Sequence, residues 1–202
     1  LLAANGYFIL EPNYRGSAGR GVEFSKADHD DLGGEEFIDV LQGIDNLIKK
    51  GFVDENQIGT GGWSYGGYFS ALAATKYSSR FKASMVGAGL TNMISFIGTT
   101  DIPYEMSVVH WNQWWFDNKQ LHWDRSPLSH INKAKTPTLI IHGMRDTRVH
   151  PEQGMELWQA LKIKNVETEF VLYPREPHGL LERPHQLDYM NRLVDWYKKY
   201  VK

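Results

Sequence analysis

The chain has 202 residues, a formal net charge of −2 and no cysteine. Its length suffices for one sizeable core, so we expect a single domain over residues 1–202. The chain has no block of Lys or Arg residues that would favour binding to nucleic acid or to an anionic membrane surface. No apolar run approaches the roughly 18 residues of a membrane helix. The lack of cysteine excludes disulfides, thiolate catalysis and cysteine zinc sites, and it leans toward a reducing, cytoplasmic compartment.

The first third of the chain predicts a strand, a loop and a helix. The sequence starts without methionine, in what reads as the last turn of a helix that ends at Gly6, so it has the look of a fragment. The apolar run Tyr7–Leu10, bounded by Gly6 and Pro12, predicts a buried strand. A glycine-rich loop follows, and apolar residues then recur every three or four positions from about Glu35 to Lys50, which predicts an amphipathic helix.

The remaining elements alternate between strands and helices. A second strand, Gln57–Gly62, runs into a helix expected over Tyr68–Tyr77. Further strands are expected at Lys82–Gly87, Thr138–His142 and Glu169–Tyr173, and further helices at Gly154–Lys162 and His185–Tyr200. Because each parallel pair of strands needs a crossover, this order predicts the α/β class, with a mostly parallel sheet flanked by helices.

An irregular, aromatic-rich insert interrupts this pattern at about residues 90–131. It contains four tryptophans and a phenylalanine, namely Trp111, Trp114, Trp115, Phe116 and Trp123. These rings are expected either to shape a substrate-binding cap or to pack an inserted helical segment, and the residues leave both interpretations open.

The segment Gly62–Gly66 reads Gly-Trp-Ser-Tyr-Gly and matches the G-x-S-x-G pattern. In this pattern the serine lies on a strained turn from a strand to a helix, and the flanking glycines let neighbouring backbone approach closely. The strand predicted before Ser64 and the helix predicted after it supply that context. Ser64 is therefore the candidate nucleophile, the alternative being a glycine-rich turn with a capping serine.

A serine hydroxyl is a weak nucleophile, so it needs a base, and the base needs an acid that fixes its tautomer. In an α/β-hydrolase these follow in the order Ser, acid, His, on loops after later strands. The strand ending at His142 leads to Asp146, and the strand ending at Tyr173 leads to His178. We therefore predict Asp146 as the acid and His178 as the base.

Other histidines and carboxylates fit these roles less well. Five of them either precede the strand that should deliver the acid or lie in the irregular segment, namely His110, His122, His130, Asp101 and Asp124. His185 opens the last helix and is expected to be solvated, His142 is expected to bond locally at a strand end, and Glu176 is expected to be a loop charge.

The residues on either side of Ser64 are the candidate oxyanion or substrate-binding residues. The backbone N–H of Tyr65 can donate to an oxyanion, and Trp63 lies next to the nucleophile on its other side. A second donor usually comes from a loop after the third strand with an HGG-type sequence, and this chain contains no such sequence.

Together these motifs resemble a known family. They are Asn13–Ser17 with Gly19 and Gly21, Gly62–Gly67, His142–Gly143 with Asp146, and Pro177–Gly179. In this order they are similar to the catalytic domain of prolyl-oligopeptidase-family serine peptidases, in the dipeptidyl-peptidase and acylaminoacyl-peptidase branches, over nearly the whole chain. The resemblance implies an α/β-hydrolase fold, cleavage of short peptides, no cofactor, and the roles given above to Ser64, Asp146, His178 and Tyr65.

The chain also departs from that family pattern. It lacks the first strands of the sheet, the second oxyanion donor and the β-propeller that usually precedes the catalytic domain. It is expected to be either an N-terminally truncated fragment, which we favour, or a protein with an incomplete site. A sheet whose first strand begins at Tyr7 would expose an unpaired edge that could pair with a second copy of the chain, so a homo-oligomer is a further hypothesis.

Three competing functions remain open at this stage. A carboxylesterase would use the same three residues on ester substrates. A nucleotide-binding module is prompted by the glycine-rich loop Gly16–Gly21, but the glycine order is not that of a dinucleotide site and no P-loop lysine follows. A non-enzymatic interaction protein would follow if the oxyanion loop were truly absent.

Overall fold

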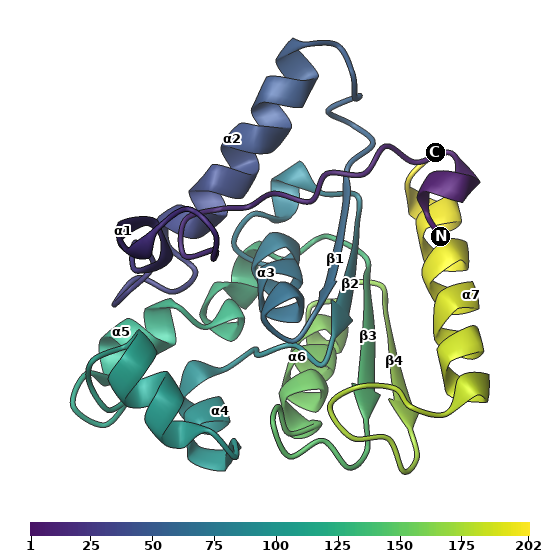
Figure 1. The fold of residues 1–202 in the computed structure, drawn as a ribbon. Coiled ribbons are helices and arrows are strands. Elements are labelled where there is room, and N and C mark those ends of the chain that lie inside the picture. Colours follow the sequence, from purple (N-terminus) through teal and green to yellow (C-terminus); the bar gives the residue numbers. More distant parts are fainter.

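A computed structural model describes residues 1–202 and contains one sheet of four parallel strands (Figure 1). The strands are β1 (Gly59–Trp63), β2 (Ala83–Gly87), β3 (Thr138–Gly143) and β4 (Thr168–Tyr173), and they lie side by side in that order. The helices are α1 (Val22–Ser25), α2 (Glu35–Lys49), α3 (Tyr65–Ala74), α4 (Met93–Thr99), α5 (Lys119–Asp124), α6 (Glu152–Ile163) and α7 (Arg183–Tyr200). None of the helices is both long enough and apolar enough to cross a bilayer.

Different helices cover the two faces of the sheet. In the central strand β3, Leu139 and Ile141 pack in a cluster with Trp196 and Tyr197 of α7, while Ile140 packs on the opposite face with residues of α3 and α6. Figure 1 shows α7 alone on its side of the sheet, with α3 and α6 on the other. The alternation follows from the two-residue period of a strand, and coverage of both faces explains why β3 is apolar nearly throughout.

The helix predicted at Glu35–Lys50 is confirmed as α2, which ends at Lys49. Its buried stripe consists of Phe37, Leu41 and Ile44, and this stripe belongs to the same core cluster as Tyr68 of α3. The four later strand predictions and the helices after them are also confirmed, with ends that differ by a few residues. The α/β class and the parallel sheet are therefore correct.

The strand predicted at Tyr7–Leu10 is wrong. This segment forms no ladder, and the side chains of Phe8, Ile9 and Leu10 are 58%, 42% and 38% exposed. Its first residue is fixed at the end of α7, where the Tyr7 hydroxyl donates to the Val201 carbonyl at 3.0 Å, and from there it crosses the molecule toward α2 (Figure 1). An extended segment becomes a strand only beside a partner for its N–H and C=O groups, and β1, the edge strand, pairs only with β2.

The aromatic-rich insert folds into short helical segments beyond the carboxyl end of β2. They are α4, a π-helical turn at Glu105–His110, α5 and a 3₁₀ turn at Pro127–Lys133. Trp111 is fully buried in the core against the ring of His122, with 4.9 Å between ring centroids. Phe116 and Trp123 are 54% and 40% exposed. The insert therefore contains both core packing and exposed aromatic surface.

Candidate active site

Ser64 lies on a sharp turn between β1 and α3. Its backbone has φ of 60° and ψ of −115°, a strained conformation for a residue with a side chain, and its N–H donates to the Gly87 carbonyl at 2.9 Å. The turn is so tight that a Cβ atom on Gly62 would lie 2.6 Å from the backbone of Gly66. Only glycine at position 62 allows this approach, which accounts for the first glycine of the motif.

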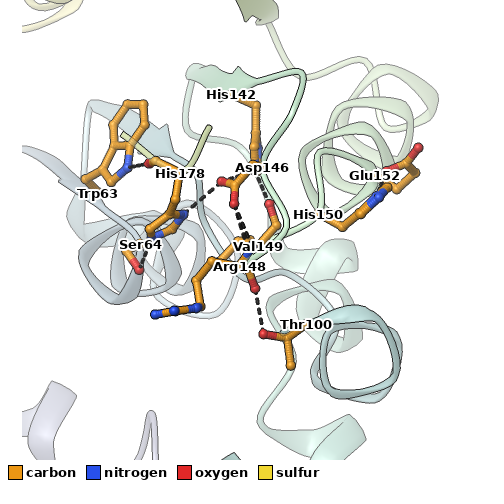
Figure 2. A network of polar contacts seen from close by, with 10 residues as sticks. All are labelled: Trp63, Ser64, Thr100, His142, Asp146, Arg148, Val149, His150, Glu152 and His178. Atoms are coloured by element: carbon orange, nitrogen blue, oxygen red, sulfur yellow. Dashed lines mark hydrogen bonds and ion pairs between the residues drawn. The ribbon is translucent and has the colours of Figure 1, made fainter. Parts of the chain in front are cut away.

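The structure brings the three predicted side chains together. Nε2 of His178 lies 2.8 Å from Oγ of Ser64, and Nδ1 lies 2.8 Å from Oδ2 of Asp146 (Figure 2). An ionised carboxylate can only accept, so Nδ1–H donates to Asp146 and the free lone pair of Nε2 accepts the hydroxyl proton of Ser64. This tautomer can remove a proton from the serine, which is the arrangement required to activate a weak hydroxyl nucleophile.

Asp146 is held as a buried carboxylate at the end of β3. Its side chain is fully buried, and Oδ1 accepts the N–H groups of Arg148 and Val149 at 3.0 and 2.9 Å. Burial would raise the pKa of this carboxyl, but the neighbouring His142 and His178 rings and the Val149 N–H lower it well below its usual range. Asp146 is therefore ionised at neutral pH, and its second oxygen is left for His178.

Trp63 and Tyr65 occupy different environments on either side of Ser64. The indole N–H of Trp63 donates to the backbone carbonyl of His178 at 2.6 Å, and so connects β1 to the histidine loop (Figure 2). Tyr65 is the first residue of α3, where N–H groups have no acceptor within the helix, and its hydroxyl donates to the buried carboxyl of Glu36. The Tyr65 N–H is thus free to serve a ligand beside Ser64, whereas its side chain points into the protein.

The other histidines and acids have structural surroundings of their own. His142 is buried and its Nε2 lies 2.8 Å from the Val149 carbonyl, so the local bond predicted for it is confirmed. The prediction that His185 is solvated is wrong, whereas Glu176 is a loop charge and not the carboxylate that orients His178, as predicted, although it is buried. Glu176 is 1% exposed, and Nδ1 of His185 lies 2.7 Å from its carboxylate, because the loop after β4 folds back onto the start of α7.

Glu36 is a buried carboxyl that the sequence did not single out. It is fully buried and accepts the Gly33 N–H at 2.6 Å and the Tyr65 hydroxyl, while Oε2 has no partner. Burial raises its pKa to about 7, against the opposing effect of these two hydrogen bonds. The sequence did offer a signal for it, because Glu36 lies next to Phe37 on the side of the predicted helix that faces the core, where an acid is unusual.

Glu36 makes the stability depend on pH in a definite direction. Below about pH 4.5 both the folded and unfolded states hold its proton; between 4.5 and 7 only the folded state does, so unfolding releases a proton and stability falls as pH rises. The shift of roughly 2.5 pKa units corresponds to about 3 kcal/mol lost by pH 8. We expect Glu36→Gln to remove this decline, measured by urea unfolding at pH 5 and pH 8.

The neighbouring residue supplies the control for this experiment. Glu35 is exposed on the same turn of α2, and Glu35→Gln should keep the pH dependence of the natural chain. Parallel stability curves for Glu36→Gln and the natural chain would contradict the assignment of the proton to Glu36.

A large cleft on the α7 side of β1 does not include the three candidate catalytic side chains. It has a volume of about 960 Å³ and runs between the segment Tyr7–Pro12, the open edge of β1 and α7, and Ser64, Asp146 and His178 are not among its lining residues. A separate group of potential metal ligands, Glu176, Glu182 and His185, has donor atoms within 4.8 Å of one another. Protein N–H groups already occupy both oxygens of Glu176, so we assign no metal to this group.

Comparison with known proteins adds sequence relationships to this geometry. The chain is 36% identical to the peptidase YuxL of Bacillus subtilis over 205 residues, and 31% identical to both acylamino-acid-releasing enzyme 1 of Oryza sativa and dipeptidyl-peptidase 5 of Porphyromonas gingivalis. These matches cover 99–100% of this chain but only 31%, 27% and 30% of the relatives. The chain thus spans about 30% of the length of the curated relatives it matches.

Solved structures and a family model agree with these relatives. The acylaminoacyl peptidase of Pyrococcus horikoshii superposes with a TM-score of 0.85 and 27% identity, covering 94% of this chain and 31% of that one. An acylaminoacyl peptidase in complex with Z-Gly-Gly-Phe-chloromethyl ketone gives 0.86 and 28% with the same coverage of this chain. The parallel sheet flanked by helices is therefore an α/β-hydrolase fold. The model of the prolyl oligopeptidase family matches residues 1–202, and the chain belongs to that family of serine peptidases.

Proposed function

We propose that this chain forms the catalytic centre of a peptidase that cleaves short peptides through a Ser64 acyl-enzyme. In this proposal Ser64 is the nucleophile, His178 the general base and Asp146 the acid that orients it. The observation that carries it is the pair of 2.8 Å contacts of His178, one to the Ser64 hydroxyl and one to a buried carboxylate. The residues 1–202 act as one catalytic domain.

In the first half-reaction the Ser64 hydroxyl passes its proton to Nε2 of His178 as Oγ attacks the substrate carbonyl carbon. The carbonyl oxygen becomes an oxyanion, and the Tyr65 N–H at the start of α3 donates to it. His178 then gives the proton to the departing nitrogen, the carbon–nitrogen bond breaks, and the acyl group stays on Ser64 as an ester.

The second half-reaction releases the acyl group. His178 takes a proton from a water molecule as the water oxygen attacks the ester carbon, and it returns the proton to Oγ of Ser64 as the bond between Oγ and that carbon breaks. The products are a carboxylic acid and the free serine. Asp146 stays ionised throughout and stabilises the imidazolium that forms twice in each cycle, in keeping with its lowered pKa.

The names of the relatives suggest two substrate classes. Acylamino-acid-releasing enzymes and dipeptidyl peptidases both match nearly the whole chain, so we propose short peptides with either an acylated N-terminus or a terminal dipeptide. The partly exposed aromatic residues between Trp114 and Trp123 are proposed to shape the pocket for the acyl side chain.

A labelling experiment tests the nucleophile first. The purified chain is treated with a fluorophosphonate probe, and the modified peptide is mapped by mass spectrometry. We expect one modification, on Ser64, because only this serine has a histidine nitrogen within reach of its hydroxyl. An absence of labelling on folded protein, or labelling of another serine, would contradict the proposal.

A substrate panel then tests the bond that is cleaved. An acetyl-aminoacyl anilide, a dipeptidyl anilide and an aryl ester of the same amino acid are compared by kcat/KM. Hydrolysis of at least one anilide supports a peptidase. Turnover of the ester with neither anilide cleaved would assign the same three residues to a carboxylesterase.

A further inference from the structure

The loop that carries His178 is fastened by a carboxylate outside the three predicted catalytic residues. Glu176 precedes His178 by two residues and is 1% exposed. Its Oε2 accepts the N–H of Leu181 at 2.6 Å, and its Oε1 accepts the N–H of Glu182 at 2.9 Å and lies 2.7 Å from Nδ1 of His185. The Glu176 side chain therefore links the first half of the histidine loop to the start of α7.

The same residue also joins the histidine loop to the loop that carries the acid. The backbone carbonyl of Glu176 accepts the N–H of Arg145, next to Asp146, at 2.9 Å. The two loops are packed so closely that a Cβ on Gly143 would lie 2.4 Å from this carbonyl oxygen and 2.3 Å from that of Pro177. A displacement of Glu176 would thus move both partners of the hydrogen bond between His178 and Asp146.

His185 completes this support from α7. Its side chain is 16% exposed, and its ring packs on Tyr173 at the end of β4 with 5.0 Å between centroids. An acceptor carboxylate fixes Nδ1 as the protonated nitrogen. Burial would raise the pKa of Glu176, but the bonds from Leu181, His185 and Glu182 lower it, so the carboxylate stays ionised and keeps every donor occupied.

From these contacts we propose that Glu176 and His185 form a positioning pair that sets the distance from His178 to Ser64 and Asp146. The inference rests on the proposed function, because it assigns the pair to the catalysis that His178 performs. Pro177, between Glu176 and His178, restricts the backbone and transmits the anchored position over two residues. Neither residue of the pair contacts Ser64, so both act through the loop.

Glutamine cannot replace Glu176 without loss, although it has the same shape. Three donors face the two carboxylate oxygens, whereas glutamine offers one oxygen and an NH₂ group. Whichever way the amide is turned, its NH₂ faces at least one backbone N–H, of Leu181 or of Glu182. The loop must shift to relieve this contact, and His178 shifts with it.

We expect Glu176→Gln to lower kcat about 10- to 100-fold while KM stays within about two-fold. A misplaced base stabilises the transition state less well, but it leaves substrate binding unchanged. The matched control is Glu169→Gln on β4, whose exposed carboxylate lies 4.0 Å from Arg192 and contacts neither residue of the pair. This control should keep the natural kcat.

A second pair of variants separates the hydrogen bond from packing. His185→Asn keeps an N–H donor at the position of Nδ1 and should restore most of the natural kcat, whereas His185→Phe keeps the ring on Tyr173 but has no donor and should resemble Glu176→Gln. Because His185 is partly exposed, these variants carry the test if Glu176→Gln fails to fold. Equal kcat for His185→Phe and His185→Asn would overturn the proposal.

An NMR measurement without turnover distinguishes this inference from the proposed function. The Nδ1–H proton of His178 that bonds Asp146 should give a far-downfield signal in the natural chain and in Glu169→Gln, and a weakened signal in Glu176→Gln and His185→Phe. An unchanged signal and kcat in folded Glu176→Gln would reject the positioning pair alone. A natural chain that shows the signal but neither labels at Ser64 nor hydrolyses a substrate would reject the proposed function.

Discussion

Ser64→Ala is expected to reduce peptidase activity by about a million-fold, to the level that the remaining site supports. Alanine keeps the Cβ atom and so leaves the strained turn between β1 and α3 in place, while removing the only oxygen within 2.8 Å of Nε2 of His178. His178→Ala should reduce activity to the same level. The measurement is kcat on the anilide that the natural chain hydrolyses fastest.

The double variant adds a sharper outcome. Because the nucleophile and its base act as one unit, Ser64→Ala combined with His178→Ala should be no less active than either single variant. Ser79→Ala, at an exposed serine in the turn after α3, is the matched control and should be fully active. Additive losses, or a Ser64→Ala variant with near-natural turnover, would show that another group attacks the substrate.

Asp146→Asn is expected to lower kcat about 10⁴-fold with the fold preserved. The amide oxygen is drawn to the position of Oδ1, where the N–H groups of Arg148 and Val149 converge at 3.0 and 2.9 Å. The NH₂ group then takes the place of Oδ2 and faces Nδ1 of His178, which can only accept from it. The neutral ring must then carry its proton on Nε2, so that Nε2 can no longer accept the proton of Ser64.

The same change should slow fluorophosphonate labelling of Ser64, because that reaction also requires an activated hydroxyl. Asp195→Asn on the exposed side of α7 is the control and should label at the natural rate. Circular dichroism of both variants checks that the fold is retained. A folded Asp146→Asn variant that labels as fast as the control would exclude Asp146 as the orienting acid.

The candidate site was predictable because its residues follow from chain order. The carboxyl ends of parallel strands lie at the same end of the sheet. That end therefore holds the glycine-flanked serine between β1 and α3, the acid after β3 and the histidine after β4. The structure brings Ser64 and His178 within hydrogen-bond distance although 114 positions separate them. The sequence alone could place each residue on a strand end, but not measure that approach.

The carboxyls of Glu36 and Glu176 escaped sequence reasoning for a shared reason. One was hidden in a helical pattern and the other looked like an ordinary loop charge, yet both are buried among hydrogen-bond donors. Some of the donors are close in sequence, such as the N–H groups of Gly33 and Leu181, but both carboxyls also accept from side chains of helices that pack against them, Tyr65 of α3 for Glu36 and His185 of α7 for Glu176. The local sequence pattern does not show that these helices pack there and bury the two carboxyls.

By itself, the sequence determined the α/β class, the order of the four strands along the chain and the three residues of the candidate site, because periodicity and motif spacing are local properties. The tertiary structure alone decided that Tyr7–Leu10 is not a strand, that Trp111 belongs to the core and that Glu176 fastens the histidine loop. Pairing and burial depend on which distant segments become neighbours, and that is settled only when the whole chain packs.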